Sequence, residues 1–176
     1  MDSPKCKFQC EEIKKLKKAI EVLKKENEML KKDKLLSDFN VFNRHYLDEL
    51  LKEEYFPKLE NKEGWFYNVA LMDLDNLHNI NREKGYEFGD IFIKNTIKKI
   101  KNIIEETKAS GRIFRIGGDE FLIIYQPYDY VDFDLINDIT FAIGTFNSKE
   151  SFKNEIKNLD EIIISKKSLK KNSERK

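Results

Sequence analysis

The chain has 176 residues, of which 37% are charged and 40% apolar, and its formal net charge is +1. This length suffices for one core of ordinary size plus an appendage, and the high charged fraction predicts that part of the chain is well exposed. The near-neutral balance gives no field that favours nucleic acid or a membrane surface, and the apolar runs are too short to span a bilayer.

The first ten residues contain no apolar signal-peptide core and hold both cysteines, Cys6 and Cys10. Two cysteines without histidine neighbours do not form a zinc site. We therefore expect free thiols in a cytoplasmic protein, with no nucleic-acid or membrane partner.

Residues 11–34 contain no Gly or Pro, and their apolar positions alternate at spacings of three and four. Ile at heptad position a, Leu at d and a single Asn at a together favour a parallel two-stranded coiled coil. The residues of this stripe are Ile13, Leu16, Ile20, Leu23, Asn27 and Leu30. An amphipathic helix packed on its own domain is the alternative, but the stripe is narrow and flanked by Lys and Glu. Residues 1–36 are thus expected to form a dimerisation stem, and residues 37–176 the domain that follows it.

Ser37 and Asp38 are candidate N-caps for a helix expected from about Val41 to Tyr55. The later elements alternate between helix and strand signals, and a hairpin separates the last two helices. In chain order they are a buried strand at 66–74, a helix at 77–84 followed by Gly85, a helix from about Phe88, strands at 113–116 and 121–125, a connection at 126–138, a strand at 139–146 and a helix from near Ser148. This order predicts an α+β fold with a ferredoxin-like, palm-type mixed sheet covered by helices.

Two glycines, Gly117 and Gly118, separate the strands of the hairpin, and Asp119 and Glu120 follow them. The glycines are expected to allow positive φ and a close approach of another group. An ordinary hairpin with a solvated acidic tip is the alternative interpretation.

A ferredoxin-like sheet would place the end of the first strand beside the hairpin turn, so that Asp73 and Asp119 converge. Taken alone, Asp73 would be interpreted as a strand-end cap and Asp119 as an acid in a turn. Together they repel unless a cation lies between them, and Mg²⁺ binds one or two carboxylates together with waters and substrate phosphates. The pair therefore favours a metal site of the kind used for nucleotidyl transfer.

Several strings resemble one family. The string at 115–121, Arg-Ile-Gly-Gly-Asp-Glu-Phe, resembles the signature of the GGDEF family, the diguanylate cyclases. Residues 73–81, continuing to Gly89-Asp90, resemble its Asp-x-Asp-x-Phe-Lys-x-x-Asn block and following Gly-Asp. Residues 141–144 resemble its Ser-Ile-Gly strand, and residues 160–172 its Ala-Asp-x-Ala-Leu-Tyr-x-Ala-Lys-x-x-Gly-Arg block. The resemblance covers roughly Phe39 to Asn172.

The resemblance implies a role for each matched position. Asp119 and Glu120 are implied as catalytic, and two Mg²⁺ or Mn²⁺ ions per active site are implied on Asp73, the Leu74 carbonyl and Asp119. The implied substrate contacts are Asn81 and Asp90 on the guanine edge, and His78, Lys167 and Lys171 on the phosphates. Guanine presents N1–H and N2–H donors that suit a carboxylate acceptor. Without the family, Asn81 and Asp90 would be caps or turn residues, and the two lysines a solvated basic tail.

The chain also departs from the family pattern. His78 stands in place of a Lys, Arg82 in place of an Asp and Tyr86 in place of a His. Residues 108–111, Lys-Ala-Ser-Gly, replace the inhibitory Arg-x-x-Asp, so no product feedback is expected there. The connection at 126–138 is shorter than usual, so one covering helix is expected to be reduced to a turn or two. None of these changes removes an implied metal ligand.

The implied activity is that of a diguanylate cyclase, which condenses two GTP into cyclic di-GMP and pyrophosphate across a homodimer. The stem would raise the effective concentration of the second half-site, and input would arrive through the stem or a regulatory protein bound to it. Two alternatives remain open. One is a related cyclic dinucleotide or oligonucleotide synthase. The other is a degenerate domain that binds nucleotide or a protein partner without turnover, which His78 and the short connection keep open.

Overall fold

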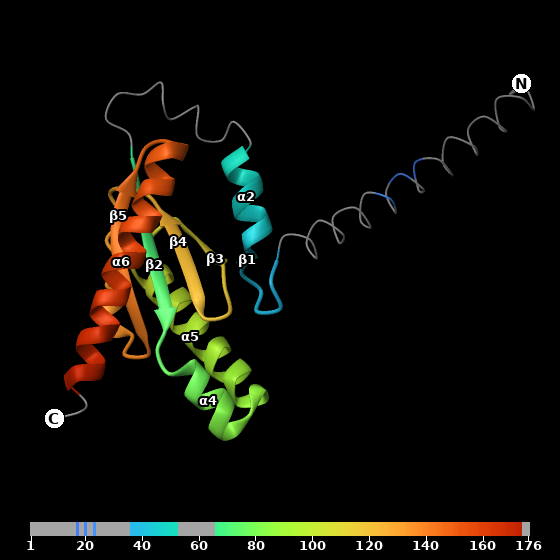
Figure 1. Ribbon diagram of the computed structural model, residues 1–176. Coiled ribbons are helices and arrows are strands. Elements are labelled where there is room, and N and C mark those ends of the chain that lie inside the picture. The colour runs from blue at the N-terminus through green and yellow to red at the C-terminus, as the bar shows by residue number, and fades with distance from the viewer. Residues whose placement is uncertain (1–16, 18–19, 21–22, 24–35, 53–65, 174–176) are drawn as a thin grey trace, which may run out of the picture.

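The computed structural model describes residues 36–52 and 66–173, together with the helical positions Lys17, Ile20 and Leu23. A five-stranded sheet lies at its centre, with helices on both faces (Figure 1). In chain order the elements are β1 (Phe42–Asn43), α2 (Arg44–Lys52), β2 (Tyr67–Leu74), α4 (Leu77–Lys84), α5 (Tyr86–Glu106), β3 (Gly111–Arg115), β4 (Glu120–Tyr125), the 3₁₀ turn η1 (Phe133–Leu135), β5 (Ile139–Phe146) and α6 (Lys149–Ser173). The predicted α+β class, with a helix-covered mixed sheet, is confirmed.

The strands lie in the order β1-β3-β4-β2-β5. β1 pairs with β3 in parallel, and every other neighbouring pair is antiparallel. The central strand β2 therefore has β4 on one side and β5 on the other. This arrangement places the end of β2 beside the β3–β4 turn, as a ferredoxin-like sheet requires.

The sheet is buried on both faces because β2 alternates between two cores. Ala70 and Met72 face a core closed by the isoleucines of α5, while Val69 and Leu71 face a core closed by α2 and α6. Each isoleucine fully buried in this way contributes about 2 kcal/mol. Continuing the alternation puts Asp73 on the α6 side of the sheet.

The start of the domain differs from the prediction. The chain forms the short strand β1 before α2, which begins at Arg44, and the Asn43 side chain accepts a hydrogen bond from the Tyr46 amide at 3.0 Å. The expected cap at Ser37 and Asp38 is wrong, because the Ser37 amide and hydroxyl both donate to the Val41 carbonyl and close a turn. A two-residue strand carries too little pattern to be recognised, and the pairing with β3 decides it.

The connection at 126–138 contains the single turn η1, which confirms the expected loss of a covering helix. Val131, Phe133 and Ile136 are buried in the core on the α5 side and cover the sheet there. Phe133 also packs edge-on against Tyr125 and Phe141, with ring centroids 6.2 and 5.7 Å apart. A short apolar segment thus replaces a helix as the cover of this face.

The helix predicted at 77–84 is observed as α4, and Gly85, with φ of 88°, separates it from α5. Within the stem, Ile20 and Leu23, neighbouring a and d positions of the predicted stripe, are 52% and 62% exposed in the single chain. The other stripe positions, Ile13, Leu16, Asn27 and Leu30, lie outside the described residues, so the coiled coil stays a prediction. In the part of the chain that the structure describes, no helix combines the length and apolarity that crossing a membrane requires.

Candidate active site

The site forms where the end of β2 meets the β3–β4 turn. Asp73 lies opposite Glu120 in the antiparallel register, and the Leu74 amide donates to the Asp119 carbonyl at 2.9 Å. Directly opposed side chains on one face of an antiparallel pair have Cβ atoms about 5 Å apart. The structure therefore brings Asp73, Asp119 and Glu120 together, as the order of elements predicts.

The turn is braced by side chains. Neither Gly117 nor Gly118 has a positive φ, so the expectation of left-handed backbone there is wrong. A Cβ on Gly117 would overlap the Glu120 carboxylate, whereas a Cβ on Gly118 meets nothing within 4 Å. Gly117 is thus needed for the close approach of the Glu120 side chain. Arg115 spans the turn, donating to the Gly118 carbonyl at 2.6 Å.

Asp73 is a half-buried carboxylate in ion-pair contact with Lys167 of α6. Burial raises the pKa of Asp73, and the neighbouring charges of Asp119 and Asp75 raise it further, while Lys167 opposes them. The net direction is upward, so one ammonium does not fully offset the desolvation and the like charges. A further cation would stabilise this carboxylate.

Glu120 projects toward the other side of the same site. It lies on a groove of about 1040 Å³ between α2 and α6, with Arg44 and Asp160 also on its walls. Burial raises the pKa of Glu120 most, and the charges of Asp119, Asp73 and Asp160 raise it further. The charge of Arg44 lowers it. A carboxyl with a raised pKa is a stronger base than an ordinary glutamate.

Asp119 opens instead onto a cavity of about 500 Å³ between the start of α4 and the end of α6. Its volume lies in the range of small-molecule sites, and basic side chains lie along it. The described residues that line it are Leu74, Asp75, Asn76, Leu77, His78, Asn79, Asp119, Asn137, Lys167, Lys170 and Lys171. The implied phosphate contacts His78, Lys167 and Lys171 thus share one cavity with the implied metal ligands Leu74 and Asp119.

Asn81 and Asp90 lie at the junction of α4 and α5, next to this cavity but not among its described lining residues. A Cβ on Gly89 would overlap the Asn81 side-chain oxygen, and the Leu77 side chain is 3.4 Å away. That Asn81 oxygen is buried and has no hydrogen-bond partner within the described residues. The adjoining Asp90 is exposed. One buried acceptor without a donor and one exposed carboxylate form a suitable pair for a ligand that brings donors.

The carboxylates at the turn suit Mg²⁺ only together with ligands from outside the protein. Among the described residues, no three Asp, Glu, His or Cys side chains are gathered closely enough to hold a metal alone. Mg²⁺ sites that act on nucleotides need fewer protein ligands, because waters and substrate phosphates complete the octahedron. Asp73 and Asp119 supply two carboxylates of that kind. Leu74, the last residue of β2, lines the cavity beside Asp119.

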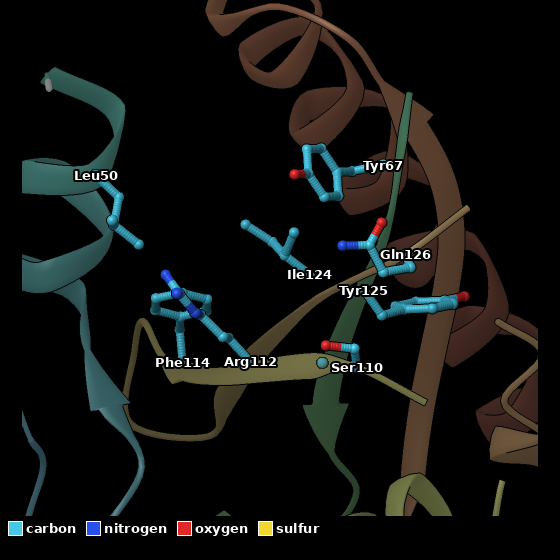
Figure 2. Close-up of a pocket in the computed structure, with 9 residues that line it drawn as sticks. Leu50, Tyr67, Ser110, Arg112, Phe114, Ile124, Tyr125 and Gln126 are labelled. Atoms are coloured by element: carbon cyan, nitrogen blue, oxygen red, sulfur yellow. The ribbon is translucent and has the colours of Figure 1, made fainter. Parts of the chain in front are cut away.

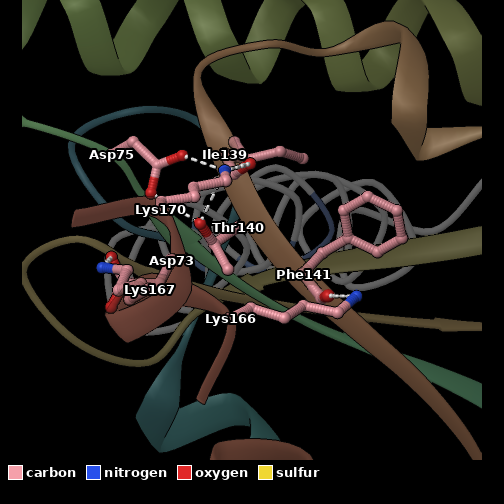
Figure 3. A network of polar contacts seen from close by, with 8 residues as sticks. All are labelled: Asp73, Asp75, Ile139, Thr140, Phe141, Lys166, Lys167 and Lys170. Atoms are coloured by element: carbon pink, nitrogen blue, oxygen red, sulfur yellow. Dashed lines mark hydrogen bonds and ion pairs between the residues drawn. The ribbon is translucent and has the colours of Figure 1, made fainter. Parts of the chain in front are cut away.

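Sequence reasoning missed a second polar cluster beside the first. Lys170 of α6 donates to Asp75 at 2.7 Å, to the buried Thr140 at 2.9 Å and to the Ile139 carbonyl at 3.2 Å (Figure 3). The signal available was the spacing of Lys170, which lies three residues after Lys167 and so on the same helix face. Nothing in the sequence identified Thr140 as its partner.

A third hollow, of about 280 Å³, lies at the opposite end of the hairpin (Figure 2). Ser110 and Arg112, at the start of β3, and Tyr125 and Gln126, at the end of β4, form part of its wall, with Tyr67 above them. None of the predicted catalytic, metal or substrate residues is among its described lining. It has no part in the site at the turn.

Comparison with known proteins identifies the family of the chain. The family model described as "Diguanylate cyclase, GGDEF domain" matches residues 39–158. The chain belongs to this GGDEF-domain family. The match begins at the residue where the resemblance was expected to begin and stops before Lys167 and Lys171.

The curated relatives are longer proteins. The chain is 33% identical over 122 residues to a probable diguanylate cyclase, DgcI, of Escherichia coli, covering 64% of this chain and 26% of that protein. It is 33% identical over 110 residues to diguanylate cyclase DgcS of Shewanella oneidensis, covering 62% of this chain and 36% of that one. The chain therefore spans about a quarter to a third of the length of these relatives.

Solved structures share the fold at low identity. The coiled coil and GGDEF domain of DgcB from Caulobacter crescentus, in complex with c-di-GMP, matches with a TM-score of 0.67 at 16% identity, covering 89% of this chain and 93% of that one. The S helix-GGDEF-EAL portion of LapD from Vibrio cholerae, bound to c-di-GMP, matches with a TM-score of 0.65 at 24% identity, covering 85% of this chain and 38% of that one. Diguanylate cyclase SiaD of Pseudomonas aeruginosa, in complex with its activator SiaC, matches with a TM-score of 0.55 at 18% identity, covering 92% of this chain and 72% of that one.

Proposed function

We propose that this chain is a diguanylate cyclase that condenses two GTP into cyclic di-GMP. The 3′-hydroxyl oxygen of one GTP forms a bond to the α-phosphorus of the other, the bond to the bridging α–β oxygen breaks, and pyrophosphate leaves. The step occurs twice, once in each direction. The observation that supports this most is the meeting of Asp73, Asp119 and Glu120 at the turn, where Asp119 lines a cavity shared with Lys167 and Lys171.

Two Mg²⁺ or Mn²⁺ ions are proposed at each site, with Asp73, the Leu74 carbonyl and Asp119 as the protein ligands. When bound, they would polarise the α-phosphate and neutralise charge on the triphosphate. Lys167 forms an ion pair with Asp73 and is well placed to turn to a phosphate once a cation binds that carboxylate. Glu120, with its raised pKa, is suited to accept the proton of the attacking hydroxyl.

The remaining contacts orient the substrate. Asp90 and the unpartnered Asn81 oxygen are proposed to accept the guanine N1–H and N2–H donors. His78 and Lys171 are proposed to contact the phosphates from opposite walls of the cavity. Adenine lacks the guanine donor pattern, so this pair favours GTP.

One domain holds one GTP, so two domains must face each other for reaction. A homodimer through the stem is proposed to supply the second half-site, and Ile20 and Leu23 are exposed for such pairing. A regulatory protein could act on the same stem. SiaD, one of the structural neighbours, was solved with an activator protein.

Incubation with GTP and Mg²⁺, followed by mass identification of the product, tests the proposal. Cyclic di-GMP is expected from the intact chain, none from Asp119→Ala, and a normal yield from Asp134→Asn, an exposed acid in η1. A different product from ATP or mixed nucleotides would identify a related cyclic nucleotide synthase. Calorimetric binding of GTP without turnover would show a degenerate domain, and activity retained in Asp119→Ala would overturn the site.

A further inference from the structure

The second polar cluster fixes the end of α6 against the sheet. Lys170 donates to Asp75, Thr140 and the Ile139 carbonyl, and the Thr140 hydroxyl in turn donates to Asp75 at 2.7 Å. An ammonium has three N–H donors, and these three acceptors match that number. Lys170 therefore has no donor left for a phosphate, although it lies on the wall of the same cavity.

The partner of Lys170 lies at a sensitive place in the chain. Asp75 follows the implied metal ligand Leu74 and precedes Asn76, whose φ of 64° starts the turn into α4. The Asp75 amide donates to the Asp138 carbonyl at 2.9 Å, so the turn is held on both backbone and side chain. Helix α4 then carries His78 to the cavity, and Asn81 lies one turn further along the same helix.

Lys170 also lies between the two lysines implied in phosphate binding. Lys167, Lys170 and Lys171 are at positions i, i+3 and i+4 of α6 and share one face of the helix. In Figure 3 Lys167 lies beside Asp73, and Lys170 beside Asp75 and Thr140. The two acids of the Asp-x-Asp segment are thus each matched to a lysine of α6.

We propose that Lys170 is a positioning residue that clamps α6 to the β2–α4 turn through Asp75 and Thr140, and so holds Lys167, Lys171 and α4 in register around the triphosphate. The proposal rests on the proposed cyclase function. The proposal gives the three lysines different roles. Lys167 leaves Asp73 for a phosphate when substrate binds and Lys171 contacts a phosphate, while Lys170 keeps its partners.

Removing the clamp has a definite electrostatic consequence. The Asp75 side chain is 17% exposed, and Lys167 and Lys171 line the same cavity as Asp75. Lys167 or Lys171 would then be drawn to Asp75 and away from the phosphates. The loss should appear as weaker GTP binding rather than slower chemistry.

Steady-state kinetics on the intact chain test this. Lys170→Met should raise the KM for GTP about tenfold and change kcat by less than about threefold. Lys166→Met is the matched control, because Lys166 is one turn earlier on α6 and donates to the Phe141 carbonyl at 2.8 Å without touching Asp75. That variant should keep the wild-type KM.

A double-mutant cycle separates positioning from direct phosphate contact. Asp75→Asn keeps the oxygen that accepts from Thr140 but removes the charge left unpaired in Lys170→Met. If Lys170 acts through Asp75, the double variant should bind GTP no worse than Lys170→Met alone. Additive losses would show that Lys170 contacts the triphosphate itself, and an unchanged KM in Lys170→Met would show that it has no role; either result overturns the proposal.

Hydrogen exchange of the nucleotide-free chain distinguishes this proposal from the cyclase function. Lys170→Met should speed exchange of the amides at 74–81, and Lys166→Met should leave them unchanged. If the wild-type chain makes no cyclic di-GMP, the cyclase proposal fails while this readout still reports the clamp. If exchange and KM are both unaltered in an active enzyme, the clamp fails and the cyclase stands.

Discussion

The cluster of acids at the turn predicts that Glu120→Gln stabilises the metal-free protein while it destroys activity. Glu120 lies opposite Asp73 and beside Asp119, and its carboxylate is held over Gly117. Two carboxylates about 5 Å apart repel by about 3 kcal/mol at an effective dielectric constant of 20 and by about 0.8 kcal/mol in water. Because the site is partly solvated, we expect about 1 kcal/mol, which corresponds to a rise in Tm of about 2–4 °C near neutral pH.

The gain depends on pH with a definite sign. The pKa of Glu120 is raised in the folded protein, so the native state holds this proton more tightly than the unfolded chain does. The associated stability is fully present below the unfolded pKa of about 4.3 and is lost as pH rises through the folded value. Gln does not titrate, so its advantage over Glu should be absent near pH 4 and should grow toward neutral pH.

Thermal unfolding between pH 4 and 8 in EDTA measures this, with product formation from GTP followed in parallel. Activity should fall by at least about a hundredfold, the usual contribution of a positioned acid or base. Glu161→Gln removes the same charge from an exposed position on α6 and should change neither quantity. A lower Tm in Glu120→Gln, or a difference that does not vary with pH, would refute the electrostatic reasoning.

Three further predictions test the geometry. Gly117→Ala should reduce activity at least about tenfold by displacing the Glu120 carboxylate, whereas Gly118→Ala, whose methyl meets nothing within 4 Å, should be near wild type in the same assay. Gly89→Ala should raise the KM for GTP severalfold by displacing Asn81 with little change in kcat, and it should not lower Tm, because Ala favours a helix over Gly by about 1 kcal/mol. Deletion of residues 1–35 should give a monomer by light scattering whose specific activity rises with protein concentration; a monomeric intact chain, or unchanged activity after deletion, would contradict a role for the stem in catalysis.

The local pattern determined most of the elements. The helix at 77–84 and the strand at 139–146 were predictable to the residue, because Gly85 ends the first and apolar β-formers fill the second. The GGDEF string and the Asp-x-Asp block identified the family, which the family model then matched over residues 39–158. These features are local in sequence, so each can be recognised without knowing what packs against it.

The tertiary structure decided which polar groups meet. Only the β2–β4 register sets Asp73 against Glu120, and only the packing of α6 on β5 and β2 brings Lys170 to Asp75 and Thr140. Asp73 and Glu120 are 47 residues apart in the sequence, and Asp75 and Lys170 are 95 residues apart. No spacing rule joins residues at such separations. The same holds for β1, whose two residues become a strand because β3 offers them an edge.

The role of the glycines in the turn was also a tertiary matter. The sequence by itself determined that a Gly-Gly pair followed by two acids links two strands. Glycines in such a turn predict a positive φ. The folded chain instead needs Gly117 for the space taken by the Glu120 side chain, and both glycines keep a negative or extended φ. A side chain three residues away, rather than the backbone conformation, sets that requirement, because the hairpin folds the acid back over the turn.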